Sequence, residues 1–311
     1  MKIKPVCIVC LITRAYKVLE KITDNEEVRM SALREVLDAI NREVNHGESP
    51  FRFVPAYLGT IRERTLKRVL SLEDPFFEIK KESNAVALKM LPSIVKALNS
   101  KNGYEKFREA CLVAVAGNAI EFDVLGREFN LNQLQDVIER AGKELVIDDT
   151  RSLYEDARGS KVLYLTDNAG EIVFDTVLVR ELKSIGARVT VAVKEKPVMN
   201  DATINEAVEA GMDKVADKLV TTGTDSVGLF LEECSQELLS EYRAADLIVA
   251  KGMGNFEVMT EYEHPCDVYF LLRTKCTPVA EYIGVPRERN VVLKLPAGGK
   301  IEMLSRERIV R

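Results

Sequence analysis

Histidine is nearly absent from this sequence, since only His46 and His264 occur among 311 residues. A histidine base, a histidine-based triad or an HExxH zinc site therefore has almost no residues to use. The chain also lacks the GxxxxGK[ST] of P-loop nucleotide hydrolases and the GxSxG of α/β-hydrolases. Its segment "KGMGNFE" (251–257) does not have the GxGxxG spacing of a dinucleotide-binding turn. These absences exclude several common enzyme mechanisms.

Long apolar runs and excess positive charge are missing too. No stretch approaches the roughly 20 apolar residues that span a bilayer, and Thr13 and Arg14 interrupt the short apolar start of the chain. No small-residue cleavage site follows, so we expect neither a signal peptide nor a membrane partner. The net charge of -5 argues against a nucleic-acid partner. We predict a cytoplasmic protein, and its oligomeric state stays open.

Six cysteines are present, and two of them, Cys7 and Cys10, form a CxxC near the N-terminus. In a reducing compartment such a pair is typical of a redox site or a metal site rather than a structural disulfide. Two thiols alone do not complete a tetrahedral zinc site. Cys266 and His264 are the candidate additional ligands if the N-terminus folds back towards them. A redox role and a second metal site both stay open for the CxxC.

Helical periodicity dominates the first half of the sequence. Apolar residues recur at helical spacing in 31–44, 59–72, 84–100, 104–122 and 130–142. Ser31 is a suitable N-cap for the first of these segments, and Pro92 is expected to bend the third. We therefore predict a multihelical domain over residues 1–155.

Short β-rich runs alternate with helical stretches after about residue 155. The runs are 161–166, 188–193, 218–222, 246–251, 267–272 and 291–295. Strands rich in Val, Ile and Leu that alternate with helices indicate a mainly parallel sheet covered on both faces. The predicted fold is α/β: the helical domain packs on a doubly wound domain of residues 156–311, with a linker within 148–160.

Polar side chains follow several of the predicted strands. Asp167 and Asn168 end the first, Asp201 lies after the second, and lysines end the fourth and fifth. Ligands of open parallel sheets bind beyond the carboxyl ends of the strands. Carboxylate and amide oxygens without histidine suit a hard divalent ion, and lysines with glycine turns suit a phosphate. Asp and Asn are also ordinary turn residues, but their convergence at one edge favours a site in the 156–311 domain.

A family resemblance rests on four segments: "TDNAGE" (166–171), "KEKPVMNDAT" (194–203), "KGMGNFE" (251–257) and "LLRTKC" (271–276). With the N-terminal CxxC, they resemble the metal-dependent damage-control phosphatases, a family formerly described as a domain of unknown function. The likeness is greatest to the CxxC-bearing archaeal and bacterial members and covers nearly the whole chain. "AGNAIEFD" (116–123) is similar to the family's Gly-Asn segment.

The resemblance implies a helical subdomain on a three-layer α/β/α sandwich, and hydrolysis of phosphate monoesters such as sugar phosphates. It implies Asp167, Asn168 and Asp201 as ligands of one divalent metal, with Mn²⁺, Ni²⁺, Co²⁺ and Mg²⁺ all compatible with oxygen donors. The residues that it implies as phosphate- or substrate-binding are Lys251, Gly252, Gly254, Asn255 and Lys275. Eukaryotic members read Arg-Thr-x-Lys where this chain has Arg273-Thr274-Lys275-Cys276.

The leading hypothesis is therefore a divalent-metal-dependent phosphatase in which metal-activated water attacks the phosphate monoester of a small metabolite. Glu171 either orients that water or caps the N-terminus of its helix. Asn118 is a substrate contact if the helical half covers the crevice, and otherwise a helix end. Two alternatives stay open: an S-adenosylmethionine-dependent carboxyl methyltransferase, and a non-catalytic phosphometabolite- or metal-binding protein.

Overall fold

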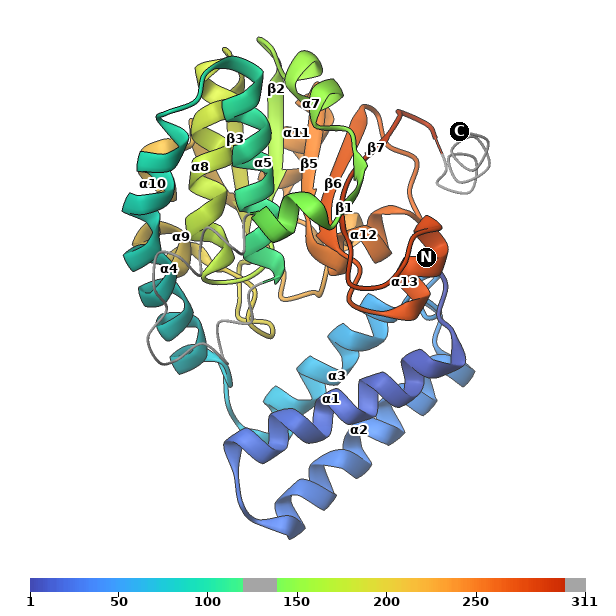
Figure 1. The fold of residues 1–311 in the computed structure, drawn as a ribbon. Coiled ribbons are helices and arrows are strands. Elements are labelled where there is room, and N and C mark those ends of the chain that lie inside the picture. Colours follow the sequence, from blue (N-terminus) through green and yellow to red (C-terminus); the bar gives the residue numbers. More distant parts are fainter. Residues whose placement is uncertain (120–138, 300–311) are drawn as a thin grey trace.

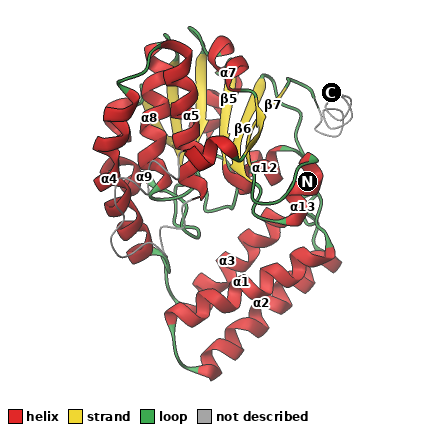
Figure 2. Ribbon diagram, viewed as in Figure 1, coloured by secondary structure: helices red, strands yellow, loops and turns green. Residues whose placement is uncertain are grey.

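A three-layer α/β/α sandwich forms the larger part of the molecule (Figures 1 and 2). The computed structural model describes residues 1–119 and 139–299. The strands are β1 (Leu145–Asp148), β2 (Lys161–Leu165), β3 (Arg188–Val193), β4 (Lys218–Thr221), β5 (Leu247–Lys251), β6 (Asp267–Arg273) and β7 (Asn290–Leu295). They form one sheet in the order β1-β7-β6-β5-β2-β3-β4. All neighbours are parallel except β6 and β7, so the predicted fold class is confirmed.

Helices cover both faces of the sheet because its strands bury alternate residues on opposite sides. Val162 and Tyr164 of β2 pack under one helical layer, and Leu163 and Leu165 pack under the other. The first layer contains α4 (Phe77–Leu98), α5 (Gly103–Ala119), α7 (Thr150–Asp156), α8 (Glu171–Ser184), α9 (Ile204–Glu209) and α10 (Met212–Val215). The second contains α11 (Gln236–Ala244), α12 (Gly252–Met259) and α13 (Thr277–Ile283).

Three helices form a separate unit at the carboxyl edge of the parallel strands: α1 (Pro5–Ile22), α2 (Glu26–His46) and α3 (Pro55–Leu70) (Figure 1). They enclose a core of their own, which includes Leu19, Val36 and Leu66. Helix α4 instead packs in the sandwich. We therefore propose a domain boundary between α3 and α4 rather than at residue 155.

Two local predictions were wrong. The first helix of the predicted set starts at Glu26, not after Ser31, because the Asn25 side chain accepts hydrogen bonds from the N–H groups of Glu27 (2.9 Å) and Val28 (3.2 Å). The first 155 residues are also not helical throughout, since β1 joins the sheet beside β7. The predicted helix at 130–142 lies mostly outside the described residues. None of the described helices has the length and apolar character that a bilayer crossing needs.

The chain reverses its direction of travel across the sheet at β2. From β2 it moves to β3 and β4, and then returns to the other side of β2 to form β5. Such a switch point opens a crevice beyond the carboxyl ends of the two strands involved. Asp167 follows β2 and Gly252 follows β5, so both lie at this crevice.

Candidate functional site

Backbone hydrogen bonds hold the two predicted metal-binding segments against each other. The Ala169 N–H donates to the Asn200 carbonyl, and the Ala202 N–H donates to the Asp167 carbonyl, both at 2.8 Å. This antiparallel bridge sets Asn168 opposite Asp201. The structure thus brings together the three residues predicted as metal ligands, although 33 positions separate Asn168 from Asp201 in the sequence.

The carboxylates of this loop pair are electrostatically strained. Burial raises the pKa of Asp167 well above its usual range, and the nearby charges of Glu171 and Asp201 raise it further. Burial likewise raises the pKa of Asp201 to about 6, although the charge of Lys194, whose Nζ lies 3.7 Å from Oδ2, lowers it. Mutual repulsion of this kind is what a bound cation relieves.

Gly252 gives Asp167 the room it needs. Its φ of +77° lies in the left-handed region, and a Cβ at this position would overlap the Asp167 carboxylate, with even the farther oxygen, Oδ1, only 2.7 Å away. Glycine at 252 therefore has a steric role, because its missing side chain lets the end of β5 approach the end of β2. Its predicted contact with phosphate stays a prediction.

Asp167 and Asp201 can form a divalent-metal site only if the Asn168 amide oxygen is a third ligand. Among the described residues, no group of three or more His, Cys, Asp or Glu side chains is placed to hold a metal. Asp167 and Asp201 supply two carboxylates, and the Asn168 side chain can supply a third oxygen. Three oxygen donors completed by water suit Mg²⁺ or Mn²⁺, which keep several water ligands when bound.

Lys251 does not point at a substrate. Its side chain is fully buried, and Nζ donates to Glu171 Oε1 at 2.5 Å, Asp175 Oδ1 at 2.6 Å and the Ala114 carbonyl at 3.0 Å. An ammonium group has three protons, and all three are used here. The predicted phosphate contact of Lys251 is therefore not supported by this geometry.

Two more residues of the "KGMGNFE" segment have structural contacts. Asn255 is buried, and its Nδ2 donates to the carbonyls of Thr166 (3.2 Å) and Lys251 (2.9 Å). Gly254 packs against the loop after β4, where a Cβ would lie 3.2 Å from Val227 Cγ1. Both tie α12 to its neighbours, and their predicted substrate contacts are not supported by this geometry.

Lys275 keeps the environment expected of a phosphate ligand. It is half-buried after β6, its charge lowers the pKa of Asp167, and it forms no ion pair with any described residue. Glu171 is completely buried at the first position of α8, so its contacts favour a structural role over orienting water. Asn118 lies in the last turn of α5, and its side chain is outside the described part of the chain.

The comparisons with known proteins decide the family. The model of the damage-control phosphatase ARMT1-like domain matches residues 3–291. This chain belongs to the ARMT1-like damage-control phosphatase family. The predicted resemblance to the damage-control phosphatases is thus confirmed, and membership supports a phosphatase role. The assignment to the CxxC-bearing members stays a prediction.

Archaeal relatives of this family member align over nearly their full length. A damage-control phosphatase of Archaeoglobus fulgidus is 37% identical over 92% of this chain and 96% of its own. An uncharacterized protein of Methanocaldococcus jannaschii is 40% identical, over 94% and 96%. The crystal structure of a DUF89 family protein from Pyrococcus horikoshii superposes with a TM-score of 0.83 at 32% identity, covering 94% of this chain and 99% of that one.

The CxxC of this ARMT1-like chain lies in the first turns of α1, with Cys7 buried and Cys10 exposed. The proposed extra ligand His264 is unsuitable, because Nδ1 contacts the Tyr242 hydroxyl and Nε2 contacts the Met259 carbonyl, each at 2.7 Å. Burial raises the pKa of Cys276, and the charges of Cys7 and Cys10 raise it further, so Cys276 lies within electrostatic reach of the CxxC. The role of the CxxC stays a prediction.

Arg62 and Asn84 are site residues of this family member that the sequence reasoning missed. Arg62 of α3 is buried, with Nη2 3.5 Å from Met199 Sδ in the loop that carries Asp201. Asn84 of α4 accepts a hydrogen bond from the Gly170 N–H (2.7 Å) and so fixes the loop after β2. Both lie on helices far from the strand ends in sequence, so no pattern in the sequence indicates that they contact these loops.

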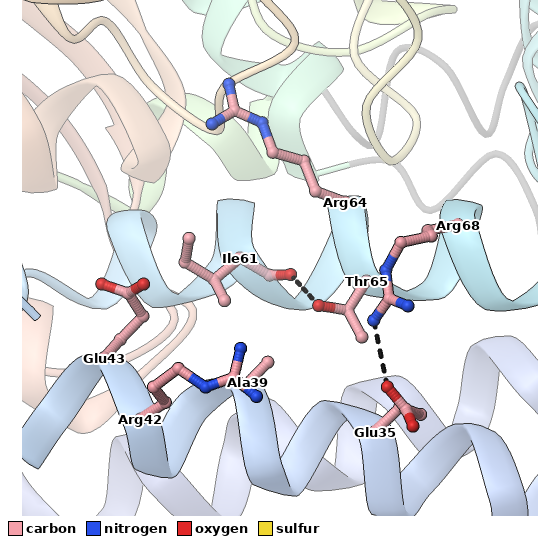
Figure 3. A pocket seen from close by; sticks show the side chains of 8 residues that line it. All are labelled: Glu35, Ala39, Arg42, Glu43, Ile61, Arg64, Thr65 and Arg68. Carbon is pink, nitrogen blue, oxygen red and sulfur yellow. Dashed lines mark hydrogen bonds and ion pairs between the residues drawn. The ribbon is translucent and has the colours of Figure 1, made fainter. Parts of the chain in front are cut away.

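A hollow of about 460 Å³ lies elsewhere in this family member, between α2 and α3 (Figure 3). It is lined by Glu35, Ala39, Arg42, Glu43, Ile61, Arg64, Thr65 and Arg68. The Arg64 side chain turns away from α2 (Figure 3). It pairs with Asp225 and Glu233 of the sandwich. No predicted site residue lines this hollow, so it is separate from the crevice at the switch point.

Proposed function

We propose that this chain is a divalent-metal-dependent phosphatase that hydrolyses phosphate monoesters of small metabolites such as sugar phosphates. The observation that carries the proposal is the pairing of Asn168 with Asp201 beside Asp167, at the switch point of a parallel sheet. The names of the archaeal relatives support the phosphatase part of this proposal.

Asp167, Asn168 and Asp201 would hold the ion through their side-chain oxygens. When bound, a divalent ion supplies charge neutralisation on the phosphoryl group and a lowered pKa for water. The protein contributes a preformed donor set, because the two backbone hydrogen bonds fix both loops before anything binds. Metal identity among Mn²⁺, Ni²⁺, Co²⁺ and Mg²⁺ is not decided by oxygen donors alone.

The phosphate would lie between the first turn of α12 and Lys275. The leading N–H groups of a helix have no intrahelical acceptors and carry a partial positive charge, which suits an anion. Helix α12 begins at Gly252, whose neighbour across the crevice is the Asp167 carboxylate. Lys275 adds a full charge from the loop after β6, and this charge stabilises the phosphoryl oxygens as the ester bond breaks.

Hydrolysis of an aryl phosphate with and without chelator tests the proposal. We expect activity to disappear with chelator and to return with Mn²⁺, Co²⁺, Ni²⁺ or Mg²⁺. A panel of sugar and nucleotide phosphates then defines the substrate class. Hydrolysis that resists exhaustive chelation would contradict the metal requirement, and no hydrolysis of any phosphate ester would contradict the phosphatase assignment.

Lys275→Met is expected to lower kcat/KM for the aryl phosphate by about 100-fold, because one charge-assisted donor to the phosphoryl group is lost. The fold should persist, since Lys275 forms no ion pair with a described residue. Steady-state kinetics and thermal melting measure both effects. Lys214→Met, which removes an exposed charge on α10, is the matched control. Equal activity of the two variants would contradict the role of Lys275.

A further inference from the structure

Lys251 sits at the centre of a buried polar network under the crevice. Its ammonium bridges Glu171 and Asp175, which lie one turn apart on α8, and all three side chains are fully buried. The Tyr164 hydroxyl donates to the same Asp175 oxygen at 2.7 Å. A buried ion pair is weak evidence for stability, because its desolvation cost is comparable to its attraction. A role in the site explains the arrangement better.

Glu171 connects Lys251 to Asn168, one of the proposed metal ligands. Oε1 accepts from Lys251, and Oε2 accepts from Asn168 Nδ2 at 3.1 Å. Helix α5 closes the remaining side, because a Cβ at Gly117 would lie 3.1 Å from Glu171 Cγ. The Glu171 side chain is therefore held in one position by the lysine, the amide and the packing of α5 on α8.

The Asn168 amide is oriented by two carboxylates. Nδ2 donates to Asp167 Oδ2 at 2.8 Å and to Glu171 Oε2. The opposite orientation would set Oδ1 against two carboxylate oxygens, which is repulsive. The network thus leaves the Asn168 carbonyl oxygen as the end that can face a cation.

We infer that Lys251 is a positioning residue of the metal site: it fixes Glu171, and Glu171 holds the Asn168 side chain with its oxygen turned to the ion. This inference rests on the proposed function, since it takes Asn168 as a ligand. Groups that orient metal ligands from behind typically control metal affinity by 10- to 100-fold, an order-of-magnitude expectation.

Whether Mn²⁺ binding becomes weaker or tighter when Lys251 is replaced distinguishes a positioning role from a purely electrostatic one. Removal of a lysine charge near a cation site should tighten cation binding if charge alone matters. Loss of positioning should weaken it. We expect Lys251→Met to weaken Mn²⁺ binding by about 10- to 100-fold, as measured by titration calorimetry on the full chain.

Lys80→Met is the matched control. Lys80 is also buried and also pairs with two carboxylates, Asp74 (2.7 Å) and Glu206 (3.2 Å), and its charge acts on Asp201. It has no hydrogen bond to Glu171 among the described contacts. Both variants should lose thermal stability, but Lys80→Met should bind Mn²⁺ as tightly as the unsubstituted chain or more tightly.

A second variant keeps the test valid if Lys251→Met fails to fold. The double variant Lys251→Met/Glu171→Gln removes the lysine and one of its two carboxylate partners, so the net charge of the site is unchanged, and Asp175 keeps its hydrogen bond from the Tyr164 hydroxyl. Its Mn²⁺ affinity should still be at least about 10-fold weaker. Unchanged or tighter binding in the folded variant would overturn the positioning role alone. Failure of the unsubstituted chain to bind Mn²⁺ would overturn the proposed metal site, and this inference with it.

Discussion

Asp167→Asn is expected to lower phosphatase activity by a factor on the order of 10³. The same substitution should raise the free energy of unfolding of the metal-free protein. The carboxylate is one of the three proposed ligands, so the asparagine variant should also bind Mn²⁺ at least about 100-fold more weakly. The stability gain follows from the raised pKa of Asp167, which means that its charged form is disfavoured by burial and by the charges of Glu171 and Asp201.

The stability gain of Asp167→Asn should increase as the pH rises. A carboxyl group with a raised pKa in the folded state binds more protons there than in the unfolded chain. The free energy of unfolding therefore falls as pH rises from the unfolded pKa of Asp through the raised folded value. Asp167→Asn should remove this loss, raising the metal-free free energy of unfolding at pH 8 with little change near pH 3.

Denaturant melts of the metal-free protein at several pH values, combined with kinetics, test this prediction. Asp213→Asn on the exposed surface of α10 is a suitable control for loss of one carboxylate. A variant that retains full activity would contradict the ligand role. A variant that is inactive because it is unfolded would contradict the claim that Asp167 strains the metal-free fold.

Gly252→Ala should also cause a large loss of activity, and the reason is steric. The added methyl group would overlap the Asp167 carboxylate, and the residue would also keep a φ of +77°. We expect a loss of about 3 kcal/mol in the free energy of unfolding and a drop of at least about 100-fold in kcat/KM, because Asp167 must leave its place beside Asn168.

Gly211→Ala isolates the conformational part of this effect. Gly211 has a closely similar φ of +76°, but a Cβ there would meet nothing within 4 Å. Its substitution should cost only about 1 kcal/mol and leave kcat unchanged. Melting temperatures and kinetics of the two variants separate the two contributions. Similar losses in both would mean that backbone conformation, and not the contact with Asp167, explains the requirement for glycine at 252.

The strand pattern was readable from sequence because parallel strands are buried on both faces and so appear as short apolar runs. β3 was predicted with the observed bounds, and β2, β4, β5, β6 and β7 to within one residue at an end. β1 was missed because only alternate residues of "LVID" are shielded from solvent and Val146 is exposed. Its sequence therefore does not appear as a continuous buried strand between the helical segments. The cap at Asn25 was missed because the apolar pattern of α2 becomes clear only after its first turn.

The family, the fold class and the three residues that meet at the switch point could be predicted from the sequence, because the motifs are local and strand ends on one edge of a parallel sheet must converge. The contacts of each remaining side chain are visible only in the folded structure. It placed Lys251 beneath the site instead of in it, since its ammonium is completely surrounded by Glu171, Asp175 and the α5 backbone. It also brought Arg62 to the loop of Asp201. Contacts between elements distant in sequence have no local pattern, so spacing alone could not predict them.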